Sequence, residues 1–192
     1  MTHRGKFFLF AFLVLISSFY NGSSFEPIYE VIEEFSKGNY QEVLQANPAF
    51  EKNEDLIVYN LICIDSSLKI SNEIPQNILD NLAKIEKPLK DYLLLEAAKR
   101  YAESGEYKKA ENFIEKVNFS QIKNVHLLYE SLRLKAQIYS KQNLWEKEAL
   151  VWSAVQKING IQNSKKQEAM FKEAIALKNG GFKERANILF QK

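Results

Sequence analysis

The sequence predicts an all-α protein, an α-solenoid of about five antiparallel helical hairpins. Two observations lead to this prediction. A helix end, a Gly and an aromatic residue recur together at Gly38-Asn39-Tyr40, Gly105-Glu106-Tyr107 and Gly181-Phe182. No useful length of the chain alternates apolar and polar residues with the period of two that marks a β-strand. Repeated helix pairs with a period of roughly 20–50 residues stack into solenoids, because each pair buries its apolar face only against its neighbours.

Each expected turn contains a residue that ends or begins a helix. In chain order these are Gly38, Pro75, Gly105, Asn143 and Gly180, and Pro75 also suits the first position of the next helix. The turn centres, at residues 38, 72, 105, 143 and 180, lie about 34, 33, 38 and 37 residues apart, which is the length of two helices of about 13–15 residues with short joints. The pairs are expected at about 26–36 with 40–45, 53–68 with 76–87, 88–104 with 107–117, 124–141 with 145–159, and 164–178 with 182–190.

Apolar residues within the expected helices recur three or four positions apart, so they share one helix face. Such a face lets each helix pack on its partner and on the next pair. In chain order the pairs carry Phe35 and Val43; Leu56, Tyr59, Ile78 and Leu82; Leu94, Ala98, Ala110 and Ile114; Leu132, Ala136, Trp152 and Val155; and Met170, Ala174, Ala186 and Phe190.

The composition is that of a folded domain, with 46% hydrophobic and 26% charged residues in a chain of 192. The chain has 26 basic and 24 acidic residues. Arg4 and Lys6 are the only Lys, Arg, Asp or Glu residues before Phe25, so the remainder has no net charge. A neutral domain lacks the basic surface that nucleic acid requires, so we expect no nucleic-acid partner.

Residues 1–24 have the three-part layout of a secretory signal peptide. Arg4 and Lys6 precede an unbroken apolar run at 7–16, and the chain turns polar and small at 21–24. We therefore expect cleavage near Ser24, a repeat domain at 25–192, and secretion across the inner membrane into the periplasm or cell envelope. An uncleaved anchor that tethers the domain to the membrane is the alternative. The lack of cysteine pairs in an exported chain favours a bacterial envelope protein.

The third pair resembles a tetratricopeptide repeat. The family pattern places large, small and aromatic residues around a Gly turn at fixed distances. The fourth pair matches less well, because Glu148 stands where a small residue is expected and Ala149 follows it. The second pair has no Gly at its turn, so a generic array of helical hairpins remains open. The matching residues of the third pair are Leu94, Ala98, Tyr101, Gly105, Tyr107, Ala110, Ile114 and Val117.

The resemblance implies a right-handed solenoid whose first helices line a concave groove, and in this family such grooves hold a protein or peptide. Mixed charges with an aromatic anchor suit an extended peptide. The positions that match the groove are Tyr92, Leu95, Lys99 and Glu103 in the third pair, and Glu130, Arg133, Gln137 and Lys141 in the fourth.

Reactive chemistry is not predicted, and we expect neither an enzyme nor a bound metal or cofactor. His126 and Glu130 share a helix face, but a zinc site takes three or four protein ligands. Cys63, the only cysteine, lies among apolar neighbours and is expected in the core. Trp145 and Trp152, seven residues apart, are expected in the core rather than on a ligand platform.

A structural or self-assembling role is the second interpretation. A solenoid needs polar faces at its ends, whereas the last expected helix carries Ala186, Leu189 and Phe190 at helical spacing. Such a face favours pairing with another copy or subunit, so the sequence also predicts a homo-oligomer formed through the fifth pair.

Overall fold

The computed structural model describes residues 27–46, 48, 50, 53–71, 73–87 and 89–191. Within these ranges the chain forms ten α-helices and one short 3-10 helix, and it forms no β-strand. The predicted all-α fold class is therefore confirmed. The predicted signal peptide at 1–24 lies outside the described residues.

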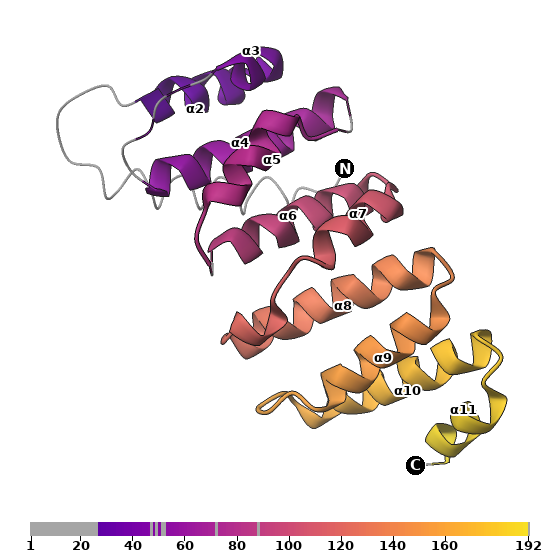
Figure 1. Ribbon diagram of the computed structural model, residues 1–192. Helices are drawn as coiled ribbons and strands as arrows, with labels where there is room; N and C mark the ends of the chain where they lie inside the picture. Colours follow the sequence, from indigo (N-terminus) through magenta and orange to yellow (C-terminus); the bar gives the residue numbers. More distant parts are fainter. Residues whose placement is uncertain are drawn as a thin grey trace.

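The helices succeed one another along the long axis of the molecule, from α2 and α3 at one end to α10 and α11 at the other (Figure 1). Sequential helices contact each other within the pairs, and α4 with α6, α7 with α8 and α9 with α10 connect one pair to the next. The helices are α2 (Pro27–Lys37), α3 (Tyr40–Gln45), α4 (Asn53–Ile70), α5 (Gln76–Lys84), α6 (Leu89–Glu103), α7 (Tyr107–Ile114), the 3-10 helix η1 (Phe119–Gln121), α8 (Val125–Lys141), α9 (Trp145–Gln156), α10 (Asn163–Asn179) and α11 (Lys183–Phe190).

Four of the turns between paired helices share one backbone conformation. Gly38, Gly105, Asn143 and Gly181 have φ between 58 and 86°, in the left-handed region. At the third turn the N–H of Glu106 donates to the carbonyl of Tyr101, five residues back, at 2.8 Å, and the other three turns repeat this bond. This is the Schellman ending of a helix, in which the left-handed residue stops the helix and redirects the chain. Asn143 replaces Gly because Asn tolerates this conformation better than most residues.

The second pair is joined by a segment of different sequence. The residues between α4 and α5 contain no Gly, and α5 begins directly after Pro75. Helix α5 ends at Lys84, three residues before the expected end, because Ile85 already has extended backbone with ψ 133°.

The third pair packs through the small and aromatic residues of the repeat pattern. Ala98 and Ala110 are fully buried, which lets α6 and α7 approach closely. Tyr101 stacks on Phe113 with ring centroids 5.4 Å apart. Helix α7 ends at Ile114, three residues earlier than expected, although Val117 is still buried.

The fourth pair buries both residues at its irregular position. Glu148 is 8% exposed and Ala149 3% exposed. The indole N–H of Trp152 donates to the Glu148 carboxylate at 3.1 Å, which gives the buried carboxylate a partner. Trp152 lies in the core as predicted, whereas Trp145 is only partly buried.

Candidate functional site

The predicted groove residues lie on α6 and α8, two helices that contact each other. Tyr92 is 40% exposed, and Glu130 is partly buried. The spacing of three or four residues places each set along one face of its helix. Seven of these residues are accessible, and together we call them the α6–α8 surface. They are Tyr92, Lys99, Glu103, Glu130, Arg133, Gln137 and Lys141.

Leu95 does not belong to this surface, which corrects the prediction. Its side chain is 8% exposed and packs in the largest core cluster with Leu93 and Leu94. Helix α6 contacts α4, α5, α7 and α8, so more than one of its faces is covered. Tyr92 is therefore the apolar anchor that the α6–α8 surface offers.

Most charges of the α6–α8 surface already lie near an opposite charge. Arg133 and Glu130 form an ion pair with 2.6 Å between nitrogen and oxygen. Arg100, beside the surface, lies 3.4 Å from Glu103 and 2.8 Å from a carboxylate oxygen of Glu96. Such partly exposed pairs contribute little to stability, so their side chains are free to exchange partners with a bound peptide.

A groove that the sequence did not predict is lined by residues of α8 and α9 and by Glu115, which directly follows α7; we call it the α7–α9 groove. Its cavity volume is about 320 Å³. One half is apolar and includes Leu150, which is 62% exposed. The residues that line this α7–α9 groove are Glu115, Leu132, Lys135, Tyr139, Lys147, Leu150, Val151 and Ala154.

The other half of the α7–α9 groove is a network of charged groups. The Tyr139 hydroxyl donates a hydrogen bond to the Glu115 carboxylate, and Lys135 Nζ lies 3.1 Å from an oxygen of the same carboxylate. Lys147 Nζ lies 2.8 Å from Glu111 and 3.6 Å from Glu115. Burial alone would raise the pKa of Glu115, but the hydrogen bonds from Tyr139 and Lys135 outweigh it and lower that pKa. The lysines of this groove are thus engaged within the chain.

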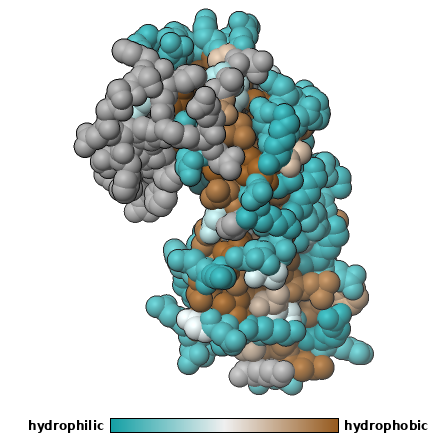
Figure 2. Space-filling view, turned by 60° about the vertical axis from the view of Figure 1, so that its left-hand side comes forward, coloured by the Kyte–Doolittle hydropathy of each residue, from teal (hydrophilic) through white to brown (hydrophobic). Residues whose placement is uncertain are grey.

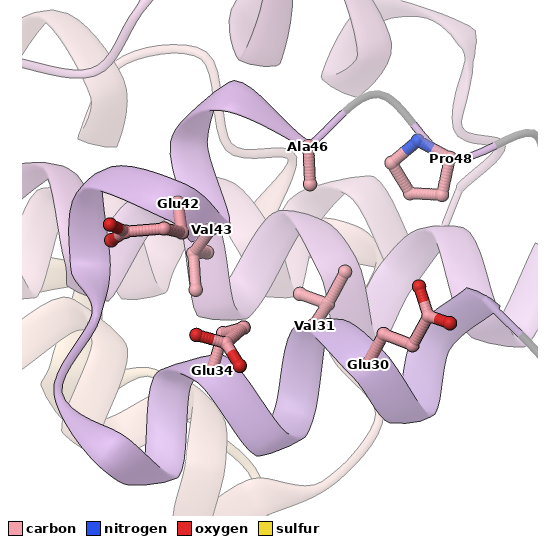
Figure 3. A pocket seen from close by; sticks show the side chains of 7 residues that line it. All are labelled: Glu30, Val31, Glu34, Glu42, Val43, Ala46 and Pro48. Atoms are coloured by element: carbon pink, nitrogen blue, oxygen red, sulfur yellow. The ribbon is translucent and has the colours of Figure 1, made fainter.

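A second cavity lies in the first hairpin, between α2 and α3, and has a volume of about 370 Å³. Its floor is apolar, and three carboxylates surround it (Figure 3). The hydrogen bonds from Asn39 and Lys37 lower the pKa of Glu34, so this rim is negatively charged at neutral pH. We call this cavity the N-terminal pocket. The residues that line it are Glu30, Val31, Glu34, Glu42, Val43, Ala46 and Pro48.

The fifth hairpin exposes large apolar side chains, and hydrophobic residues reach the surface at the lower end of the molecule in Figure 2. The rings of Phe171 and Phe190 meet edge to face with centroids 5.9 Å apart. Ala186, expected on the exposed face, is 1% exposed because it packs inside the pair against Leu177. We call the four exposed apolar residues of this hairpin the C-terminal patch. Their exposed fractions are 56% for Phe171, 36% for Phe182, 58% for Ile188 and 44% for Phe190.

Cys63 and His126, the two residues considered for reactive or metal chemistry, lie in different environments. Cys63 is fully buried, as predicted, and burial raises the pKa of its thiol to about 12. His126 is exposed, and within the described ranges no three His, Cys, Asp or Glu residues are placed to share a metal ion. Among the same residues, no helix combines the length and the apolar character needed to cross a membrane.

We compared the chain with protein-family models, with curated proteins and with solved structures, and none of the three comparisons gave a match.

Proposed function

We propose that this protein is an exported helical-repeat scaffold that binds a protein or peptide on its α6–α8 surface. The proposal includes a right-handed α-solenoid of tetratricopeptide type, with the first helix of each pair on the concave side, and delivery to the periplasm or cell envelope by residues 1–24. The recurrent Schellman turn supports a repeat architecture, because four turns with the same geometry redirect the chain in the same way. A scaffold of this kind acts through shape and surface chemistry rather than catalysis.

The observation that carries the proposal is the character of the α6–α8 surface. It combines an exposed aromatic side chain, Tyr92, with Lys99, Arg133 and Gln137 on two contacting helices. Gln137 has both a donor and an acceptor for the backbone of an extended peptide. The planar guanidinium of Arg133 can donate two parallel hydrogen bonds to a carboxylate of the peptide. The ring of Tyr92 can bury apolar surface against the peptide with little loss of side-chain entropy.

A double charge reversal tests this surface. Lys99→Glu with Arg133→Glu reverses two of the three cations of this surface, while two exposed lysines elsewhere, Lys84→Glu with Lys157→Glu, give a control of equal charge change. Tagged protein is used to capture partners from an envelope extract, and co-purifying proteins are quantified by mass spectrometry. We expect the first variant to lose a partner that the wild type and the control retain. Equal capture by all three proteins would exclude the α6–α8 surface.

A structural or self-assembling module is the second candidate, and the C-terminal patch favours it. Four large apolar side chains on one hairpin are the kind of surface that another subunit covers. Light scattering over a range of concentrations tests this candidate, because a strict monomer would rule out assembly through identical copies.

A further inference from the structure

The first and the fifth hairpin, at the two ends of the described row of helices, carry opposite charges. Residues 27–46, the first hairpin, contain four glutamates and one lysine, a net charge of −3. Residues 163–190, the fifth hairpin, contain six lysine and arginine residues and three glutamates, a net charge of +3. These hairpins lie at opposite ends of the row of helices in Figure 1. The ends are therefore complementary to each other, and each repels a copy of itself.

The apolar surfaces at the two ends are complementary as well. The N-terminal pocket has an apolar floor below Glu30, Glu34 and Glu42, and a cavity of roughly 150 Å³ is enough for a benzene-sized group. Its volume of about 370 Å³ therefore accommodates an aromatic ring. The C-terminal patch presents Phe190 on α11, the helix that also carries the exposed cation Lys183.

The internal joints of the molecule indicate how such a contact is made. Inside the row, the second helix of one pair packs on the first helix of the next, as α7 does on α8 and α9 on α10. Helix α11 is the second helix of the fifth pair and exposes Ile188 and Phe190. Helix α2 is the first helix of the first pair and contributes Glu30, Val31 and Glu34 to the N-terminal pocket. A second copy placed end to end would repeat the internal joint.

We propose that copies of this chain associate head to tail, with the C-terminal patch of one copy in the N-terminal pocket of the next. Phe190 enters the pocket, and Lys183 and Arg185 of the same copy face the glutamates of its rim. This contact joins two different surfaces, so it produces rings or open filaments rather than closed two-fold dimers. The inference deepens the self-assembling function proposed above and does not depend on the α6–α8 surface.

Two variants, each with one altered end, test this arrangement. The N-end variant is Glu30→Lys with Glu42→Lys, and the C-end variant is Lys183→Ala with Phe190→Ala, so the two altered ends do not attract each other; all four side chains are exposed. Sedimentation velocity is measured on each protein alone and on the two mixed, after circular dichroism has verified the fold. We expect wild-type protein to associate with concentration, and each variant alone to associate about tenfold more weakly or not at all. The mixture retains one intact contact, so it forms a 1:1 pair that grows no further.

Three results would overturn the arrangement, and they separate it from self-assembly in general. If the wild-type protein stays monomeric, both the self-assembling function and the head-to-tail contact are excluded. An N-end variant that associates like the wild type leaves self-assembly through the C-terminal patch but removes the head-to-tail contact. So does a mixture that forms no pair. Salt gives a test on wild-type protein alone, because raising NaCl from about 0.1 to about 1 M shortens the screening length from about 10 to about 3 Å. Association through opposite charges weakens under this change, whereas unchanged or stronger association contradicts the charge complementarity.

Discussion

The phenol oxygen of Tyr101 in α6 accepts a hydrogen bond from the backbone N–H of Ile74, at 2.9 Å. Ile74 lies in the loop between α4 and α5 and is 7% exposed, so its amide depends on this acceptor. The same phenol ring stacks on Phe113 of α7. One side chain of the third hairpin therefore fixes the loop of the second, at the turn whose sequence contains no Gly.

Removing this hydroxyl should destabilise the fold. Tyr101→Phe keeps the ring stack but leaves the buried Ile74 amide without an acceptor, which costs about 1–3 kcal/mol. Urea unfolding followed by circular dichroism measures the loss. Tyr107→Phe removes a hydroxyl from the other aromatic residue of the repeat pattern and should change stability by less than about 0.5 kcal/mol. Equal losses of unfolding free energy in the two variants would show that the Tyr101–Ile74 hydrogen bond does not contribute to stability beyond the effect of removing any tyrosine hydroxyl.

The Schellman turns predict opposite effects at two equivalent positions. Gly105 has φ 85°, and no atom lies within 4 Å of the place a Cβ would occupy, so Gly105→Ala suffers only from its backbone conformation. That penalty is about 1–2 kcal/mol. Asn143→Gly removes the same strain and should leave stability unchanged or slightly higher. Thermal melts of both variants test this, and a destabilised Asn143→Gly would mean that the Asn side chain, not the turn conformation, matters there.

The sequence predicts the turns and pairs well because their signals are local. A left-handed turn residue such as Gly105 must be Gly or Asn, and apolar spacing over one helix defines its buried face. The prediction that Leu95 lines the groove is wrong because the burial of Leu95 depends on neighbouring helices, which the spacing within α6 does not reveal. The α7–α9 groove was missed for the same reason, since Glu111 and Lys147 are 36 residues apart and meet only in the folded chain. Surface sites made by distant elements therefore need the structure.

The signal peptide proposed at residues 1–24 predicts where the mature chain begins. If residues 1–24 are a signal peptide, protein recovered from the periplasm should begin near Phe25, because signal peptidase cleaves after the small residues that follow the apolar run. Intact mass spectrometry of the purified protein reads this directly. A mass that includes residues 1–24, together with recovery in the membrane fraction, would support the uncleaved anchor instead.

Cys63 should report on opening of the second hairpin. Its side chain is fully buried in α4, and burial raises the pKa of its thiol to about 12, so almost no thiolate exists at neutral pH. A thiol reagent that requires the thiolate should react with native protein far more slowly than with protein unfolded in urea. The rate should follow the opening equilibrium as urea is added. Immediate reaction in the absence of urea would contradict the burial of Cys63.

The bridge between α7 and α9 predicts how stability depends on pH. Glu111 accepts from Lys147 at 2.8 Å, its side chain is 6% exposed, and the hydrogen bond from Lys147 lowers its pKa below the ordinary value of 4.5. A carboxyl group whose pKa is lower in the folded state stabilises the fold at every pH above its pKa in the unfolded chain. This stabilisation is lost as the pH falls through the pKa of the group in the folded state. Glu111→Gln should therefore cost about 1 kcal/mol at neutral pH, and this difference from the wild type should shrink below about pH 4.5.

Urea midpoints measured from neutral to acidic pH test the sign of this effect. Glu86→Gln, at an exposed position, serves as the control and should follow the wild type throughout. A Glu111→Gln deficit that persists unchanged at low pH would mean that the side chain contributes through packing rather than charge. A deficit that grows as the pH falls would require a raised pKa, which the contact with Lys147 opposes.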